Sequence, residues 1–238
     1  MSADRLAAEL RRLYLLPQGD GAPALRGPAG ETRAPVLALG RPADWAALAP
    51  LWRGVQLDLQ WPAPAIAVSG EGLQLWFSLQ QPLPAERAAA LLAGLQARYL
   101  AEVEPHRVQC LPALTAPTAS APLVPAPLAL PEQWSAFVAP DLAPVFADTP
   151  WLDIPPSPEG QAELLVRLQS IPPAALDAAL QALQAQQCDT PAPPAVAAPA
   201  SAATADLDPR QFLQRVLNDE SAPLALRVDA ARALLQHR

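Results

Sequence analysis

Apolar side chains recur every three or four residues near the start of the chain. In residues 3–16 they stand at Leu6, Leu10, Leu13 and Tyr14, a spacing that predicts one face of a helix. Gly and Pro dominate 17–35 and predict a loop. Residues 36–39 predict a short strand. Pro42 suits the first turn of a helix that Pro50 is expected to kink or end and that carries Trp45, Leu48, Leu51 and Trp52.

Alternation of apolar and polar residues marks the next stretch. GVQLDL at 54–59 predicts a strand with Gln56 and Asp58 on its polar face. AIAVS at 65–69 and LQLWFSL at 73–79 predict a hairpin around a Gly-containing turn. Because successive side chains of a strand point to opposite faces, we expect Leu73, Leu75, Phe77 and Leu79 on the core face and Gln74, Trp76 and Ser78 on the other.

A helix and a strand are predicted next, and they suggest the fold class. The helix begins at Pro84, and its apolar stripe is Leu91, Leu92, Leu95, Tyr99 and Val103. The strand covers 107–111. Strand, hairpin, helix and strand in this order predict an α+β fold, with a small antiparallel or mixed sheet packed with helices.

Residues 111–131 are rich in Pro, Ala, Thr and Ser and predict an extended segment. The aromatic residues that follow, Trp134, Phe137, Phe146 and Trp151, are anchors that bind either the core of this chain or a partner. Residues 160–169 and 173–187 predict two helices. The low-complexity Pro, Ala and Thr residues at 189–205 predict a disordered linker.

The last 33 residues predict a pair of short helices. Asp208 and Pro209 match a helix cap and first turn, and Pro223 opens the second helix. Two such helices cannot bury a core alone, so we expect them to bind the main domain, another copy or a partner through Phe212, Leu213, Val216, Leu217, Leu224, Val228, Leu234 and Leu235.

These elements suggest five regions. They are an N-terminal helix and loop at 1–35, an α+β core at 36–111, a Pro-rich segment with aromatic anchors and two helices at 112–188, a linker at 189–205, and the helical tail at 206–238.

Charge and composition narrow the partner classes. All 16 cationic residues are arginine, as expected from codon bias in a GC-rich bacterial genome, and the net charge is −7. Residues 54–205 hold only four of the arginines against thirteen acids. This balance argues against strong non-specific nucleic-acid binding but leaves a local basic patch open.

Targeting signals and cysteines point to a cytoplasmic protein. The first 16 residues mix acids and arginines, unlike a signal peptide, and no apolar run has the length of a membrane span. Cys110 and Cys188 have no partners at metal-ligand spacing, so we expect two reduced thiols.

No complete catalytic motif is present. Gly70 and Gly72 lack the third glycine of a dinucleotide site, and no nucleophile-elbow pattern surrounds Ser69. Glu102, Glu104 and His106 lie at a helix end, where a solvated surface role is expected, and Asp148 and Asp153 suit turns and caps. The sequence therefore predicts no catalytic residue, no metal ligand and no cofactor, and it favours a protein that is not an enzyme without deciding the question.

One constellation suggests binding. If 54–59 is a strand, the polar face of the sheet presents Asp58, Ser69, Gln74, Trp76 and Ser78, with Arg107 nearby. Small α+β modules bind single-stranded nucleic acid or nucleotides on such a face by stacking and polar contacts. The alternative is a solvated or helix-covered face that binds nothing.

Residues 55–95, VQLDLQWPAPAIAVSGEGLQLWFSLQQPLPAERAAALLAGL, resemble the central part of archaeo-eukaryotic-type primase-polymerases, especially the plasmid replication primase branch. That family shows an acidic strand, a strand ending in Ser-Gly or Thr-Ser, a hairpin strand with His or Gln before an aromatic residue, and a helix. HRVQCLP at 106–112 is faintly similar to the family's arginine strand.

The departures from this family concern catalysis. Its members hold two divalent metals with paired carboxylates, whereas Asp58 has Gln56 and Gln60 two residues away. Gln74 stands where many members have a nucleotide-contacting histidine. The resemblance therefore implies a primase-like fold in which catalysis is lost.

The tail sequence DPRQFLQRVLNDESAPLALRVDAARALL resembles two-helix segments of phage and mobile-element proteins. Together the two resemblances imply a non-catalytic, primase-like module of bacterial DNA metabolism or a mobile element, which binds single-stranded DNA or a nucleotide weakly. The competing hypothesis is a protein–protein adaptor without a nucleic-acid role, which uses its aromatic segment and its C-terminal helices. An active enzyme, the third hypothesis, would require metals.

Overall fold

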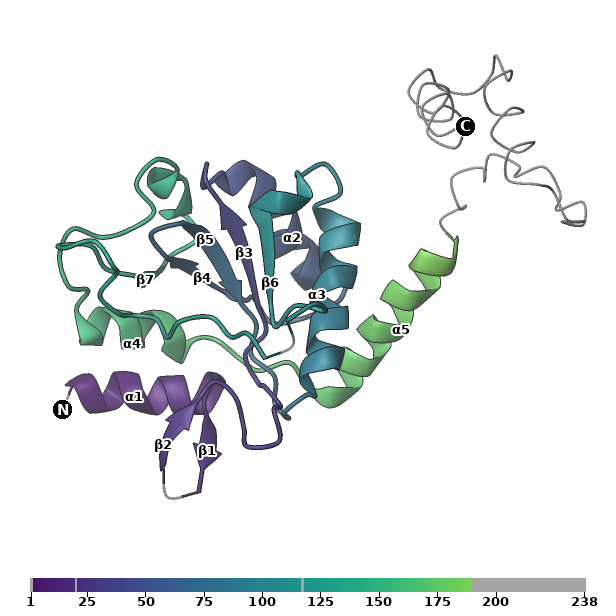
Figure 1. Ribbon diagram of the computed structural model, residues 1–238, viewed down its shortest axis with the longest axis horizontal. Coiled ribbons are helices and arrows are strands. Elements are labelled where there is room, and N and C mark those ends of the chain that lie inside the picture. The colour runs from purple at the N-terminus through teal and green to yellow at the C-terminus, as the bar shows by residue number, and fades with distance from the viewer. Residues whose placement is uncertain (1, 20, 117, 190–238) are drawn as a thin grey trace, which may run out of the picture. The chain divides into compact units, whose positions relative to one another are not determined.

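The computed structural model describes residues 2–19, 21–116 and 118–189. This part of the chain holds five α-helices, a five-stranded antiparallel sheet and a two-stranded sheet, as Figure 1 shows. The predicted α+β class is confirmed. The predicted helical tail and all but the first residue of the predicted linker lie outside the described residues; Asp189 ends a helix.

The centre of the fold is one β-α-β-β-α-β unit. In chain order its elements are β3 (Val36–Gly40), α2 (Trp45–Leu57), β4 (Ala65–Val68), β5 (Gly72–Trp76), α3 (Ala85–Tyr99) and β6 (Val108–Leu111). The strands lie in the order β6-β3-β5-β4-β7, and every neighbouring pair is antiparallel. The first four strands of that order have the arrangement of a ferredoxin-like fold.

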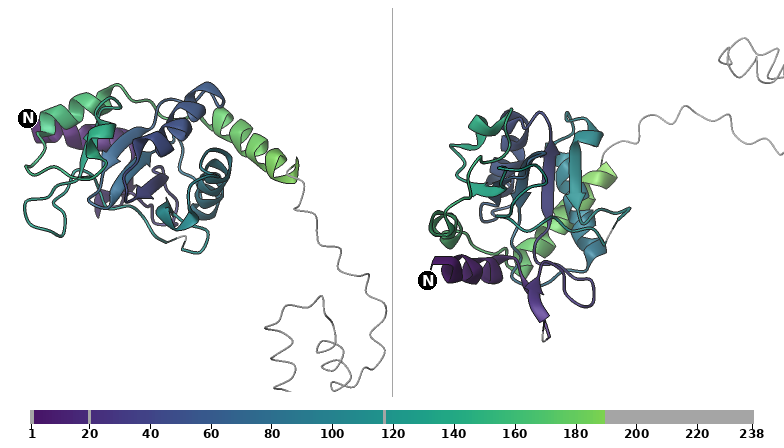
Figure 2. Two further views of the ribbon diagram at one scale, coloured as in Figure 1. Left: turned by 90° about the horizontal axis from the view of Figure 1, so that it is seen from above. Right: turned by 60° about the vertical axis from the view of Figure 1, so that its left-hand side comes forward.

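Helices α2, α3 and α5 (Pro173–Asp189) cover one face of this sheet, as the two views of Figure 2 help to follow. The sheet contributes Leu37, Leu39, Leu73 and Leu75 to this core, and Leu48, Leu51, Leu91 and Leu95 come from the helices. The core face predicted for residues 73–79 is therefore confirmed. Burial of these aliphatic side chains is the main stabilising contribution on this side.

Helices α1 (Ser2–Leu13) and α4 (Pro158–Val166) cover the other face and lie side by side. Arg5 forms an ion pair with Glu163 at 2.7 Å. The guanidinium of Arg12 donates to the backbone carbonyls of Leu165 and Leu168, both at 3.0 Å. These bonds reach carbonyls at and just after the end of α4, so they join α1 to α4.

The strand β7 (Ala136–Val138) forms one edge of the sheet and pairs with β4. On its outer side the backbone N–H of Phe137 donates to Oε1 of Gln161 at 2.7 Å, and Nε2 of Gln161 donates to the carbonyl of Phe137 at 3.0 Å. One buried side-chain amide thus takes the place of a further strand. This arrangement closes the edge against pairing with another chain.

Two of the predicted elements are wrong. Residues 54–59 are not a strand: α2 continues to Leu57, with Asp58 as its C-cap. Buried Leu48, Leu51 and Val55 recur at helical spacing, and this longer pattern outweighs a six-residue alternation. Pro50 does not end α2, because it lies on the exposed side of the helix and removes only one hydrogen bond.

The predicted loop at 17–35 also contains regular structure. The strands β1 (Leu16–Gln18) and β2 (Gly21–Ala24) form a separate hairpin. From 112 to 135 the described residues contain no helix or strand, in agreement with the predicted extended segment.

The aromatic anchors differ in how they meet the core. Phe137 is buried between the sheet and the helix pair, and Phe146, in the 3-10 helix η2 (Ala143–Phe146), is partly buried against the other core. Trp151 stays near the surface, with the guanidinium of Arg41 5.3 Å from its ring centroid. Of the two alternatives for this segment, binding to the core of its own chain is confirmed for Phe137 and Phe146.

Candidate functional site

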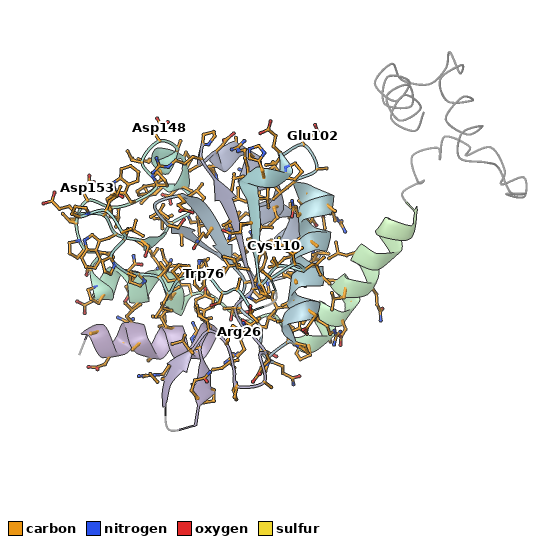
Figure 3. The ribbon with its side chains drawn as sticks, viewed as in Figure 1. Arg26, Trp76, Glu102, Cys110, Asp148 and Asp153 are labelled. Carbon is orange, nitrogen blue, oxygen red and sulfur yellow. The ribbon has the colours of Figure 1, made fainter. Side chains whose placement is uncertain are left out.

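The polar sheet face predicted to contact nucleic acid is buried. Gln74, Trp76 and Ser78 share one face as predicted, but their exposed fractions are only 5%, 0% and 5%. Trp76, labelled in Figure 3, is therefore fully buried. Helices α1 and α4 cover this end of the face, so the predicted open binding face is wrong and the alternative of a helix-covered face is the correct one.

The buried polar groups of this face bind one another. Nε1 of Trp76 donates to Oε1 of Gln74 at 2.9 Å, and the Trp76 ring makes edge contacts with Tyr14 and Phe137. The hydroxyl of Ser78 donates to the carbonyl of Leu13 at 2.7 Å. Trp76 is thus part of an aromatic core and has no free face on which a base could stack.

Asp58 lies in the helical layer, away from that face. Its Oδ2 accepts hydrogen bonds from the hydroxyl of Tyr99 at 2.9 Å and from the guanidinium of Arg98 at 3.1 Å. Burial first, then the hydrogen bond to Asp58, raises the pKa of Tyr99 to about 12. Asp58 therefore joins the end of α2 to α3 and does not belong to a site with Ser69.

Ser69 and Arg107 do come together, in an open cleft at the far end of the same sheet face. The cleft has a volume of about 370 Å³, and the loop of Ser69 and Glu71 and the turn of His106 and Arg107 are among the residues that line it. The hydroxyl of Ser69 donates to the carbonyl of Gly72 at 3.1 Å, and Arg107 donates to the carbonyl of Pro42 at 2.7 Å.

Glycines keep this cleft open. Gly40 and Gly72 lie opposite each other on β3 and β5 and leave the sheet without side chains there. A Cβ on Gly72 would overlap the carbonyl oxygen of Leu39, so this position requires glycine. Charges of both signs surround the cleft. Arg107 and the exposed Glu71 both line it, and Nε2 of the lining residue His106 lies 3.5 Å from Oε2 of Glu104.

A second depression was not predicted from the sequence. It is a groove of about 640 Å³ between the start of α2 and η2, lined by Asp44, Trp45, Ala46, Ala49, Pro50, Arg53, Pro144 and Ala147. Beside it Leu142 and Val145 are 51% and 71% exposed. The only feature of the sequence that pointed to this groove was Pro50 inside a helical pattern. The opposite wall of the groove comes from residues about 100 positions later, Pro144 and Ala147.

The other candidates behave as surface or structural groups. Glu104 and His106 are well exposed and contact each other. Oδ1 of Asp153 accepts from Nε1 of Trp151 at 3.1 Å within its own turn. Burial raises the pKa of the Cys110 thiol to about 11, which keeps it protonated and unreactive as a nucleophile near neutral pH.

The described residues 2–19, 21–116 and 118–189 hold neither a metal-ligand cluster nor a membrane-spanning helix. There, no group of three or more His, Cys, Asp or Glu side chains is arranged to hold a metal ion, and no helix combines the length and hydrophobicity needed to cross a membrane. No protein-family model matches the chain, and no curated protein matches it either.

Proposed function

We propose that this chain is a protein–protein adaptor that binds a partner through the groove between α2 and η2. The observation that carries the proposal is the pairing of this groove with exposed Leu142 and Val145. Binding grooves on proteins are concave and mostly apolar, with a few polar groups that fix orientation. The tail at 206–238 is proposed as a second contact, as its apolar pattern suggests.

The distribution of side chains around η2 supports this proposal. The segment 134–155 holds exposed Leu142, Val145 and Ile154 among prolines and acids. Interfaces combine an apolar centre with a polar rim, and aromatic residues are enriched in them. Trp45, which is partly buried, is the aromatic residue of the groove.

Affinity capture from a bacterial lysate tests the adaptor function. The full chain, Val145→Asp and Leu57→Asp are compared after nuclease treatment. Val145 lies in η2, which forms one wall of the groove, whereas the control Leu57 is 72% exposed at the C-terminal end of α2, beyond the groove. We expect proteins that Leu57→Asp retains and Val145→Asp loses. Recovery of the same proteins by all three chains would place the interface elsewhere, and recovery that disappears with nuclease would contradict the adaptor. A chain lacking 206–238 measures the contribution of the tail.

A second candidate function rests on the glycine-floored cleft. We propose, as the alternative, weak binding of single-stranded DNA or a nucleotide there, in keeping with the resemblance of residues 55–95 to primase-polymerases. The meeting of Ser69 and Arg107 beside Gly40 and Gly72 favours it, because an arginine and close backbone approach suit phosphate. Glu71 and the overall acidity oppose it.

Fluorescence anisotropy of labelled single-stranded DNA at low salt tests this alternative. Arg107→Ala should weaken binding about tenfold, because it removes a charge-assisted contact. Arg87→Ala is the matched control, since Arg87 is an exposed arginine on α3 that does not line the cleft. Absence of binding at low salt, where phosphate contacts are strongest, would remove the nucleic-acid hypothesis.

A further inference from the structure

The groove between α2 and η2 contains a backbone acceptor that its own helix does not satisfy in the usual way. Pro50 has no N–H group, so the carbonyl of Ala46 lacks the i+4 hydrogen bond of an α-helix. Ala46 and Pro50 lie one above the other on the exposed side of α2, and both line the groove. A carbonyl of this kind favours a ligand that supplies a hydrogen-bond donor.

Trp45 immediately precedes Ala46 in the sequence. The centroid of the Trp45 ring is 6.0 Å from that of Trp52, whose ring is tilted by 59° against it and whose Nε1 donates to the carbonyl of Pro64 at 3.0 Å. The partly buried Trp45 ring also lines the groove. A tryptophan face attracts ammonium and guanidinium groups and also buries apolar side chains.

The charges of the groove are separated along α2. Asp44 lines the groove and caps the helix, with its Oδ1 accepting from the Ala46 N–H at 2.8 Å, and Asp148 follows the lining residue Ala147. Arg53 stands nine residues further along, about 13 Å away at the rise of an α-helix. The segment 134–155 around η2 contains three acids and no arginine, and one arginine from outside it, Arg41, contacts Trp151. The Asp44 end is therefore the anionic end.

We infer that the groove binds an extended segment of a partner protein that carries an arginine or lysine beside apolar side chains. The cation lies at the Asp44 end, over Trp45 and within reach of the Ala46 carbonyl, and the apolar side chains lie along Pro50 and Pro144 towards Arg53. This inference rests on the proposed adaptor function and adds to it the chemistry of the partner. Charge complementarity with the acidic segment around η2 is its main support.

Three labelled peptides of equal length test the inference with the full chain. One combines Leu and Pro with Arg, one has Glu in place of Arg, and one has Ser in place of Leu. Anisotropy at low and high salt should show saturable binding of the first peptide alone, weakened by salt. Equal binding of the Glu peptide would overturn the assignment of a cation, and equal binding of the Ser peptide would overturn the apolar requirement.

Two substitutions separate the contributions within the groove. Asp44→Ser keeps a good N-cap and removes the charge, so α2 should stay intact while the Arg peptide binds about two- to fivefold more weakly. Trp45→Leu keeps apolar packing but removes the ring face, and a loss of about tenfold is expected. Leu57→Asp, at the C-terminal end of α2 beyond the groove, should not weaken binding of this peptide. Unchanged affinity in both Asp44→Ser and Trp45→Leu would overturn the inference.

The outcomes distinguish failure of this inference from failure of the adaptor function. If the lysate capture depends on Val145 and the Arg peptide does not bind, the adaptor stands and the proposed partner chemistry is wrong. If sedimentation shows self-association that Val145→Asp removes, the occupant is a second copy of this chain, which also overturns the inference. If neither capture nor peptide binding occurs, both proposals fail.

Discussion

The two faces of the five-stranded sheet are covered in different ways. Helices α2, α3 and α5 fill one face with leucine-rich packing, and two of them belong to the β-α-β-β-α-β unit itself. The other face is covered by α1 and α4, which are far apart in the sequence, and its core includes the aromatic group Tyr14, Trp76 and Phe137. Polar residues that alternate along a strand can thus be buried by segments that lie far away in the sequence.

The second face is also divided along its length. At one end α1 and α4 exclude water from Trp76, and at the other end Gly40 and Gly72 leave the cleft open. RNA-binding modules built on a similar sheet present aromatic residues on the open face. In this chain the aromatic end is closed, and no Phe, Tyr or Trp lines the open end.

The largest expected effect comes from emptying the aromatic core. Trp76→Ala should destabilise the fold by about 3–5 kcal/mol, because the cavity it leaves in a rigid core fills poorly. Trp151→Ala is the control, since this ring is half-buried and contacts Arg41 at the surface; about 1 kcal/mol is expected. Chemical denaturation measures both. Equal losses would show that the second face contributes no core.

The closed edge of β7 gives the next effect. Gln161→Leu leaves the N–H and carbonyl of Phe137 without their partners, and a loss of about 2–3 kcal/mol is expected together with faster hydrogen exchange at the Phe137 amide. Gln109→Leu, on the exposed edge strand β6, should change stability by less than about 0.5 kcal/mol. Similar values for the two variants would mean that the Gln161 bonds do not support the edge.

The two glycines of the cleft should respond differently to the same substitution. Gly72→Ala should cost about 1–3 kcal/mol, because the added Cβ overlaps the Leu39 carbonyl. Gly40→Ala meets only the Arg107 carbonyl at 3.5 Å, an ordinary contact, and should stay within about 0.5 kcal/mol. Thermal unfolding distinguishes them. If Gly40→Ala also abolished DNA binding, the cleft rather than the fold would be responsible.

The smallest effect concerns the helical layer and pH. Tyr99 keeps its proton in the folded state up to about pH 12, against an ordinary pKa of 10.0. Its contribution to stability is therefore complete below pH 10 and is lost as the pH rises from 10 to about 12. Asp58→Asn should lower the pKa of Tyr99 and move that loss to lower pH. Tyrosinate absorbance checks this, with Tyr99→Phe as the control, and an unchanged titration in Asp58→Asn would contradict the prediction.

The spacing of apolar residues along the sequence predicted most of the helices and strands. The alternation at 73–79 identified the core side of β5, and helical spacing identified α1, α3, α4 and α5. The strand prediction failed at 54–59, where a short alternation of apolar and polar residues coincides with the end of α2. The β1–β2 hairpin was missed, because it lies in a stretch rich in Gly and Pro.

The candidate sites depended on tertiary contacts, and here the sequence could not decide. The prediction that Gln74 and Trp76 share one face of the sheet was correct. No neighbouring residue in the sequence indicates that α1 and α4 cover that face. Ser69 and Arg107 meet because β6 returns beside β3, and the groove at Trp45 exists only because η2 packs near α2. Each of these contacts joins residues that are tens of positions apart in the sequence.

The bonds from Arg12 to α4 also bear on how this chain is made. They join residues 153 and 156 positions apart. During synthesis α1 therefore cannot pack against α4 until nearly all of the described chain has left the ribosome. Over that interval Tyr14 and Trp76 lack their cover, and such exposed surface in nascent chains attracts chaperones and promotes aggregation. A chain truncated before residue 158 would keep that exposure permanently, and cellular quality control would then decide its abundance.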